Sequence, residues 1–423
     1  MPAAVVQDPI EAVRPYEELR PELELLLAST RTTISQQTTG RIRALARGTM
    51  EWSYVLRAAE EHGVRPLLYR SFSTICPDIV PESVMEHLHS FVLANVARNM
   101  FLARELNRLL KGFKDHGISA IPFKGPVLSI MVHGDPSMRE AGDLDIVVPE
   151  RNLREAMGLL VTHGYRRRTP GLPETVTGVN QEDPGRYHIF DRNDSRATVD
   201  LQASLEAPHF SFPLDECLWD RAASQRFAGE TVSIFCAEDT FILLCIHGTK
   251  DVWFKLKWIC DIADFIERNK GIDWDLVLYQ ATRLHAKRKL LLGCFLAHSL
   301  LGANLPRNIV LAASKEPMVR ASAGTIIKNL SASNRKFTGF ERATLYLNTD
   351  DTWWDKIRRC LRYVFCYLSV AVVPSENDRR SLHLPNLFSS VGYFVRPVRL
   401  IAKYLMSPRL GVKVLREWFE AFD

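Results

Sequence analysis

The stretch that decides the fold is Gly142-Asp143-Leu144-Asp145-Ile146-Val147-Val148, two acids one residue apart at the head of an apolar run. Alternate side chains of a β-strand point to the same face, so Asp143 and Asp145 would share one face while their apolar neighbours pack on the other. Two carboxylates on one rigid face suit hard divalent cations such as Mg²⁺, which prefer oxygen ligands. The stretch therefore predicts a strand that carries two candidate metal ligands.

A third acid stands alone in the segment Ala197-Thr198-Val199-Asp200-Leu201. If this segment is a neighbouring strand, Asp200 joins the other two acids, and three carboxylates can hold a pair of metal ions about 3.5–4 Å apart for phosphoryl or nucleotidyl transfer. The spacing alone is weak evidence, because Glu22-Leu23-Glu24 and Asp273-Trp274-Asp275 share it and such pairs usually lie in solvated turns or helices. The apolar strand that follows and the Lys124-Gly125 turn that precedes distinguish the Asp143 pair.

Composition indicates an ordinary globular protein. The chain has 423 residues, of which 46% are hydrophobic and 24% charged, enough for two or three domains with their own cores. Its eight cysteines form no C-x-x-C pair, which favours buried reduced thiols of a cytoplasmic protein over a disulfide frame or a zinc site. No signal peptide is expected, and the nearest apolar run, 360–373, is too short to span a membrane.

Basic residues concentrate near the end of the chain. Residues 351–423 contain twelve Lys and Arg against seven Asp and Glu, which accounts for the whole formal charge of +5. Such a region can meet RNA, anionic lipid or another polyanion. A helical surface solvated by Arg and Lys explains the same excess more simply.

Periodicity predicts an α+β chain with a small mixed sheet between helical regions. The first part has helical patterns at 50–62 and 81–116. Strand and helix patterns then alternate: strands at 118–123 and 143–148, helices at 126–132 and 151–163, and a hairpin at 187–191 and 196–204, after a Pro- and Gly-rich loop at 170–185. Helical patterns return at 238–247, 254–268, 276–285, 289–301, 355–373 and 391–405. We therefore expect a helical region at 1–117, an α/β core at 118–206 and a helical domain at 207–423.

Taken in order, several motifs resemble one known family. They are Phe123-Lys124-Gly125, Arg139 followed by Gly142 to Val148, Val199-Asp200-Leu201, His247-Gly248-x-Lys250-x-x-Trp253, the run Leu256 to Ala263, and Arg396-Pro397-x-Arg399-Leu400. The chain resembles the uncharacterised nucleotidyltransferase family of bacteria, a branch of the superfamily that shares the catalytic core of DNA polymerase β. The resemblance runs from about Trp52 to Tyr404, and it implies a polymerase β-like nucleotidyltransferase core embedded in a mainly helical chain.

The resemblance implies transfer of a nucleoside monophosphate from an NTP to a hydroxyl of an acceptor, with pyrophosphate leaving. Asp143, Asp145 and Asp200 would be the catalytic residues and would bind Mg²⁺, or Mn²⁺ in its place. Asp200 would also activate the acceptor hydroxyl. The amide of Gly125, at a helix N-terminus, would receive a phosphate oxygen. Lys124 or Arg139 would neutralise the leaving pyrophosphate.

Other assignments have simpler rivals. Arg139 could equally form a structural salt bridge with Asp143. His247 and Lys250, one helical turn apart, could face the nucleotide, although a histidine on an apolar helix is more often a hydrogen-bonded core residue. The chain has Gly125-Pro126 where the superfamily commonly has Gly-Ser, and Gln202 where a histidine often follows the third acid. The second departure bears on contacts to the acceptor.

Two other classes of function remain open at this point. A catalytically inactive relative could bind nucleotide or a partner without chemistry, although all three acids are present. An RNA-binding or RNA-modifying protein is suggested by the basic region alone, and no aromatic RNA-binding motif supports it. The sequence identifies neither the preferred NTP nor the acceptor, for which a sugar, a peptide side chain or another small hydroxyl compound is conceivable.

Overall fold

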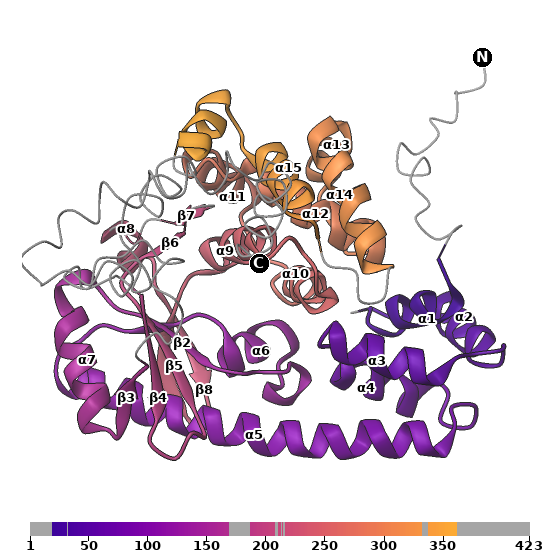
Figure 1. The fold of residues 1–423 in the computed structure, drawn as a ribbon, viewed down its shortest axis with the longest axis horizontal. Helices are drawn as coiled ribbons and strands as arrows, with labels where there is room; N and C mark the ends of the chain where they lie inside the picture. Colours follow the sequence, from indigo (N-terminus) through magenta and orange to yellow (C-terminus); the bar gives the residue numbers. More distant parts are fainter. Residues whose placement is uncertain are drawn as a thin grey trace, which may run out of the picture.

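The computed structural model describes residues 19–31, 33–168, 187–207, 210–212, 214, 216–331 and 337–361. These residues form an α+β structure in which helices surround a small mixed sheet, as the sequence predicts (Figure 1). The expected loop at 170–185, the pattern at 391–405 and the Arg396 motif lie outside the described residues.

The sheet has five strands in the order β1-β2-β5-β4-β3. Their bounds are β1 (Ile121–Pro122), β2 (Leu144–Val147), β3 (Tyr165–Arg167), β4 (Tyr187–Arg192) and β5 (Thr198–Gln202). Strands β2 and β5 are parallel, and the other neighbouring pairs are antiparallel. Strand β1 is shorter than the expected 118–123, although the backbone amide of Phe123 still donates to the carbonyl oxygen of Asp145 at 3.3 Å.

Two helices flank β2 along the chain. The predicted helices appear as α6 (Gly125–His133) and α7 (Leu153–Thr162), with short 3₁₀ turns η1 (Pro136–Met138) and η2 (Glu150–Asn152) beside them. The long helix α5 (Glu82–Asp115) runs from the sheet to the N-terminal helices along one side of the molecule (Figure 1). It ends where predicted, because Gly117 takes the left-handed conformation that follows a helix end.

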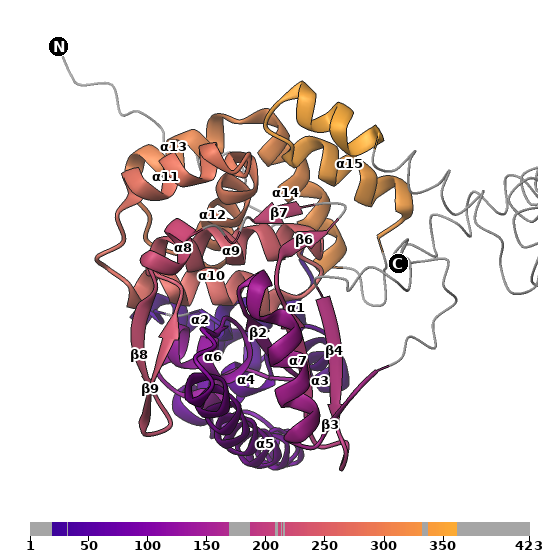
Figure 2. The ribbon, with the colours of Figure 1, turned by 90° about the vertical axis from the view of Figure 1, so that its left-hand side faces the viewer.

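The remaining elements are mainly helical. They are α1 (Pro21–Ser29), α2 (Gln36–Ala46), α3 (Trp52–Glu61), α4 (Arg65–Ile75), β6 (Leu205–Ala207), β7 (Phe210–Phe212), α8 (Glu216–Asp220), β8 (Ala223–Phe227), β9 (Glu230–Ile234), α9 (Ala237–Lys250), α10 (Leu256–Arg268), α11 (Trp274–Arg283), α12 (Lys287–Leu301), α13 (Arg307–Lys315), α14 (Pro317–Leu330) and α15 (Gly339–Thr349). Helices α9 to α15 lie on the side of the molecule opposite to α5, as two perpendicular views show (Figures 1 and 2).

Two buried hydrophobic clusters hold these layers together. The first joins α1–α4 to α9–α14, so the two ends of the described chain share one core. The second contains the last turns of α5, the apolar face of β2 and β5, and the hairpin β8–β9. The division of the chain at 117/118 and 206/207 stays a prediction, because these clusters report packing and not independent folding.

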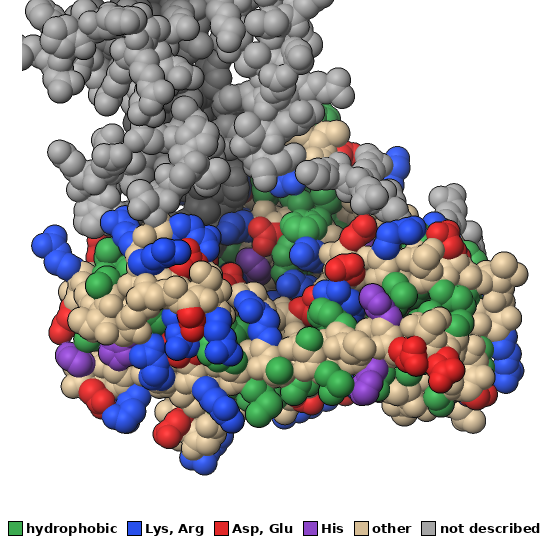
Figure 3. Space-filling view, turned by 60° about the horizontal axis from the view of Figure 1, so that its bottom comes forward, with side chains coloured by type: hydrophobic (Ala, Val, Ile, Leu, Met, Phe, Trp, Pro, Cys, Tyr) green, Lys and Arg blue, Asp and Glu red, His purple; other side chains and the backbone are tan. Residues whose placement is uncertain are grey.

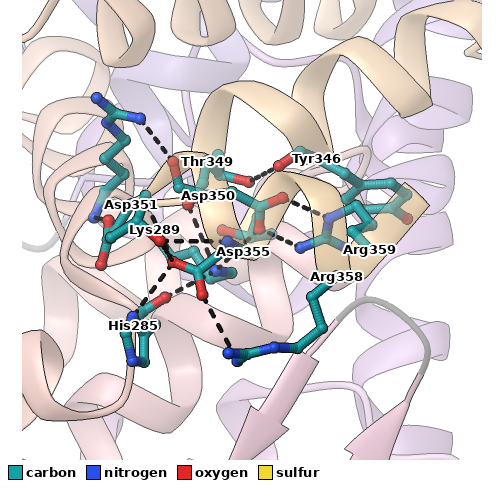
Figure 4. Close-up of polar contacts among 12 residues, drawn as sticks. His285, Lys289, Tyr346, Thr349, Asp350, Asp351, Asp355, Arg358 and Arg359 are labelled. Carbon is teal, nitrogen blue, oxygen red and sulfur yellow. Dashed lines mark hydrogen bonds and ion pairs between the residues drawn. The ribbon is translucent and has the colours of Figure 1, made fainter. Parts of the chain in front are cut away.

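Ion pairs and hydrogen bonds around Asp350 and Asp351 join the segment 353–361 to helix α12 (Figure 4). Buried Asp350 accepts hydrogen bonds from Arg359, which lies on the helical segment 353–361. Asp351 accepts hydrogen bonds of 2.7 Å from the backbone amides of Lys287 and Arg288 at the start of α12. These contacts satisfy amides that the first turn of a helix leaves without partners, so they attach segment 353–361 to α12.

Within the described residues, no helix combines the length and the apolar character that crossing a bilayer requires.

Candidate active site

The three predicted carboxylates lie on one face of the sheet. Asp143 immediately precedes β2, Asp145 lies within it, and Asp200 pairs with Asp145 in the parallel ladder between β2 and β5. Leu144 and Val199, which alternate with the acids, are buried in the core on the opposite face. The alternation read from the sequence therefore places all three acids together.

Each of two carboxylates has its own polar partner. Lys124 Nζ lies 3.2 Å from Asp145 Oδ1, and Gln202 Nε2 donates to the same oxygen at 3.4 Å. The Tyr187 hydroxyl donates to Asp200 Oδ2 at 2.6 Å. Gln202, which stands where a histidine is common in the superfamily that the chain resembles, thus contacts one of the proposed metal ligands.

Burial and the repulsion of neighbouring acids raise the pKa of Asp143 and of Asp200. Burial raises the pKa of Asp143, and the neighbouring charge of Asp145 raises it further. Burial also raises the pKa of Asp200 to about 6, against the opposing hydrogen bond from Tyr187, and the charges of Asp145 and Asp143 add to the rise. Carboxylates that repel one another in this way are stabilised by a bound cation.

The acids do not form a closed metal site by themselves. Within the described part of the chain, no three or more His, Cys, Asp or Glu side chains are gathered as one ion would need. Asp145 is turned toward Lys124 and Gln202, and Asp200 toward Tyr187. This donor set fits an ion such as Mg²⁺, which proteins often bind through one or two carboxylates while substrate phosphates and water supply the other ligands.

A tight turn places Lys124 beside the acids. Lys124 is the residue before the first turn of α6, and Gly125 has φ +58°, a left-handed conformation that favours glycine. A Cβ at Gly125 would lie 3.0 Å from the carbonyl oxygen of Asp143, so the turn packs directly against the start of β2. Pro126 fits within the first turn of α6, where no intrahelical amide bond is lost. The predicted lysine–glycine turn therefore opens a helix next to the carboxylates.

Helix α5 holds the loop that leads into β2. The side-chain amide of Asn99 donates to the carbonyl oxygens of Pro136 and Arg139, both at 2.8 Å, and Asn95 donates to that of Ser137 at 2.7 Å. Arg98, on the same side of α5, donates to the carbonyl oxygen of Gly142 at 2.7 Å. Residues at spacings of three and four share a helix face, so α5 fixes the loop and with it the position of Asp143. Sequence reasoning identified none of these three side chains.

Arg139 is buried and faces α10. Its Nε lies 3.1 Å from both carboxylate oxygens of Asp261, and its exposed fraction is 7%. Asp261 is the buried acid in the Leu256 to Ala263 motif, and a charge in that position requires such a partner. Next to it, Arg65 holds Glu140 through two hydrogen bonds of 3.0 Å. Arg139 therefore ties the loop before β2 to the helical layer.

The His247 motif forms the end of α9. His247 Nε2 lies 3.4 Å from Asp251 Oδ2, and its ring packs edge-on against Trp258. Burial lowers the pKa of His247 well below its usual value, and the charge of Lys124 contributes further to the lowering. The imidazole is therefore neutral at neutral pH. Lys250 is at the last turn of the same helix.

The glycine and tryptophan of this motif have a structural role. A Cβ at Gly248 would lie 2.5 Å from the ring of Trp253, which is fully buried. Val252 and Trp253 both have positive φ, at +47° and +54°, in the connection between α9 and α10. Such backbone strain persists only where the surroundings impose it. The buried indole thus fixes the angle at which His247 and α10 approach the sheet.

Lys257, on α10, is a cation of the site that sequence reasoning missed. Within the part of the chain that the structure describes, its ammonium group has neither a hydrogen-bond nor an ion-pair partner. Burial lowers the pKa of Lys257 to about 8, the charge of Arg139 lowers it further, and Asp261 opposes the change. The charge of Lys257 in turn lowers the pKa of Asp143, so the two side chains lie within electrostatic reach.

The space-filling view shows a hollow in the molecular surface with basic, acidic and histidine side chains around it (Figure 3). Such a combination of opposite charges in a concave surface is typical of sites for charged ligands.

Comparison with known proteins identifies one family. Residues 48–302, more than half of the chain, match the family model described as uncharacterised nucleotidyltransferase. The chain belongs to this nucleotidyltransferase family. No curated protein and no solved structure matched it.

The matched range contains every residue of the candidate site, from Arg65 on α4 to Asp261 on α10. It ends at the C-terminus of α12, so helices α13 to α15 and the basic region 351–423 lie beyond it. The family resemblance read from the motifs is thus confirmed, whereas the individual roles of the nucleotidyltransferase's site residues stay predictions.

Proposed function

We propose that this protein transfers a nucleoside monophosphate from an NTP to a hydroxyl of an acceptor, with release of pyrophosphate and with Mg²⁺ or Mn²⁺ as cofactor. The observation that supports this most is the pairing of Asp145 with Asp200 in a parallel ladder, with Asp143 on the same face and Lys124 beside it. The family match supports the general reaction class. The metal, the NTP and the acceptor belong to the proposal.

The carboxylates suit a cation that arrives with the nucleotide. Because Asp143 and Asp145 repel each other and do not enclose an ion alone, a divalent cation would be held between them and the triphosphate. When bound, such an ion neutralises developing negative charge on the triphosphate and lowers the pKa of a coordinated hydroxyl. Lys124, now paired with Asp145, would turn toward a phosphate oxygen when a cation takes over the carboxylate.

The other roles follow from position. Asp200 would accept the proton of the acceptor hydroxyl, since it lies on the same face as Asp145 and already accepts a hydrogen bond from a hydroxyl group, that of Tyr187. The backbone amide of Gly125, at the N-terminus of α6, would receive a phosphate oxygen and benefit from the helix dipole. Lys257 would bind the triphosphate from α10, because its charge lowers the pKa of Asp143 and its ammonium group makes no hydrogen bond or ion pair within the described residues.

The predicted nucleotide contacts have two kinds of role, an indirect one for Arg139 and a direct one for His247 and Lys250. Arg139 is already bonded to Asp261, so it would act by holding the loop before β2 and only indirectly on the triphosphate. His247 and Lys250 would face the nucleotide from the end of α9, where the neutral imidazole can donate or accept a hydrogen bond. The acceptor, for which a sugar or a peptide is conceivable, would approach from the side of Asp200.

The proposal is tested by measuring pyrophosphate release with each of the four NTPs in the presence of Mg²⁺, Mn²⁺ or EDTA. We expect metal-dependent release that increases when an acceptor is supplied, starting with hydroxyl-bearing sugars and peptides. Asp115→Asn is a matched control, because Asp115 is an exposed acid on α5 paired with Lys111. Nucleotide binding without release under any of these conditions would instead favour the catalytically inactive relative.

A further inference from the structure

The hydroxyl of Tyr187 occupies a position next to the proposed base. It donates a hydrogen bond of 2.6 Å to Asp200 Oδ2. Among the residues that the structure describes, Tyr187 is the one hydroxyl-bearing side chain with a hydrogen bond to Asp143, Asp145 or Asp200. A group that is to lose its proton to Asp200 must make this same contact.

The sheet places this hydroxyl on the reacting side. Tyr187 begins β4 and lies opposite Gln202 of β5, two residues beyond Asp200 in the ladder. Residues two apart on a strand share a face, so Tyr187, Asp200 and Gln202 lie on the carboxylate side of the sheet. The side chain of Tyr187 is 49% exposed, so a ligand can reach it from solvent while its hydroxyl is held at Asp200.

We propose that Tyr187 is itself a nucleotide acceptor and that the chain modifies this residue in an intramolecular reaction. The inference rests on the proposed function, which supplies the NTP. The phenolic oxygen of Tyr187 would attack the α-phosphorus of the bound NTP, and Asp200 would take the phenolic proton. A new oxygen–phosphorus bond forms as the bond between the α-phosphorus and the bridging oxygen of the β-phosphate breaks, and its electron pair leaves with pyrophosphate.

This modification would be self-limiting. A nucleoside monophosphate on Tyr187 stays beside Asp200 and occupies the place where any external acceptor must bind. Each chain would therefore accept a single nucleotide, and further transfer to an external acceptor would slow as the modified fraction grows. The chemical class of the acceptor in this reaction is a phenol, which distinguishes it from transfer to a sugar hydroxyl.

The test is incubation of the full chain with each α-phosphate-labelled NTP and Mg²⁺ or Mn²⁺, followed by intact mass measurement and peptide mapping. We expect label at up to a single nucleotide per chain, located on Tyr187, at a rate per chain that does not depend on protein concentration. Tyr187→Phe should reduce labelling to background. Tyr279→Phe is the matched control and should label as the wild type does, because Tyr279 is an exposed tyrosine on α11 with an exposed fraction of 65%.

The outcomes separate this inference from the proposed function. Metal-dependent NTP binding or transfer to an added acceptor, without labelling of the chain by any NTP, would overturn the role of Tyr187 and leave the proposed function intact. Label on another residue, or a rate that rises with protein concentration, would also overturn it. Absence of both NTP binding and labelling would overturn both proposals. Because the mapped residue is read from the wild-type chain, the test holds even if Tyr187→Phe fails to fold.

Discussion

Replacing Lys257 by methionine should weaken nucleotide binding without lowering stability. The substitution removes one ammonium group and keeps the length of the side chain. A charge-assisted hydrogen bond contributes about 1.5–3 kcal/mol. At about 1.4 kcal/mol for each tenfold change, the expected loss of affinity for the NTP is about 10- to 150-fold.

The structure gives a reason for unchanged or increased stability. The aliphatic part of Lys257 runs along the backbone at Gly63, where an added Cβ would lie 2.9 Å from its Cδ, and methionine can keep that packing. Folding lowers the pKa of Lys257 from 10.5 to about 8, so the folded chain holds the ammonium proton less tightly than the unfolded chain. Stability from this group is lowest below pH 8 and rises between about pH 8 and 10.5. Removing the charge should therefore not lower the melting temperature at pH 7.

Calorimetric titration with each Mg²⁺–NTP, together with thermal unfolding of the same samples, measures both effects. Lys328→Met is the matched control, since Lys328 is an exposed lysine on α14, away from the carboxylate face. The wild type should also lose affinity as the pH rises above about 8, and Lys257→Met should not show this dependence. A variant that binds NTP as tightly as the wild type would refute the role of Lys257 at the triphosphate.

Three further substitutions test the support of the site. Asn99→Ala removes the side-chain donor of the Pro136 carbonyl oxygen and the shorter of the two donors of the Arg139 carbonyl oxygen, and it should lower the free energy of unfolding by about 1–3 kcal/mol in urea titrations. Gly125→Ala forces a left-handed φ on alanine and should lower the free energy of unfolding by about 1–2 kcal/mol, with loss of pyrophosphate release. Arg139→Met leaves buried Asp261 without its partner and should lower the free energy of unfolding by about 3–5 kcal/mol. A second substitution, Asp261→Asn, should restore part of this loss. Equal stability of Arg139→Met and wild type would contradict this pairing.

The local pattern of the sequence was sufficient for the strand that carries the acids. The alternation of acidic and apolar residues at the start of the segment 143–148 predicts that Asp143 and Asp145 lie on one face of the strand. Because β5 pairs with β2 and Asp200 lies opposite Asp145, Asp200 lies on that face too. The helix boundaries at Gly117 and Pro126 could also be predicted, because glycine adopts the left-handed conformation that follows a helix end without strain, and proline has the fixed φ of a first helical turn.

The contacts that support the site could not be read in the same way. Asn99 and Arg139 are separated by 40 residues and Arg139 and Asp261 by 122, so no local period connects them. The helical pattern at 254–268 assigned no role to Lys257, whose burial depends on the tertiary packing of α10. The spacing of residues within an element predicts its faces, and only the tertiary structure tells which faces meet.

A missed hairpin has a different cause. Strands β8 and β9 are joined by Ala228 and Gly229, both with positive φ, at +46° and +90°. Two-residue hairpin turns of this kind usually contain Asn-Gly or Asp-Gly, because alanine is strained in the left-handed region. Without that signal, the segment from 223 to 234 carried no recognisable turn.

We expect the face of Asp143, Asp145 and Asp200 to hold a divalent cation together with an NTP. The most direct measurement is Mn²⁺ binding by electron spin resonance, with and without a non-hydrolysable NTP, for the wild type, Asp145→Asn and the control Asp115→Asn. We expect NTP to strengthen Mn²⁺ binding in the wild type and in Asp115→Asn, and folded Asp145→Asn to lose this binding, because one of the carboxylates beside the triphosphate is gone. Equal Mn²⁺ binding by folded Asp145→Asn and the wild type would contradict the assignment of this face as the metal–nucleotide site.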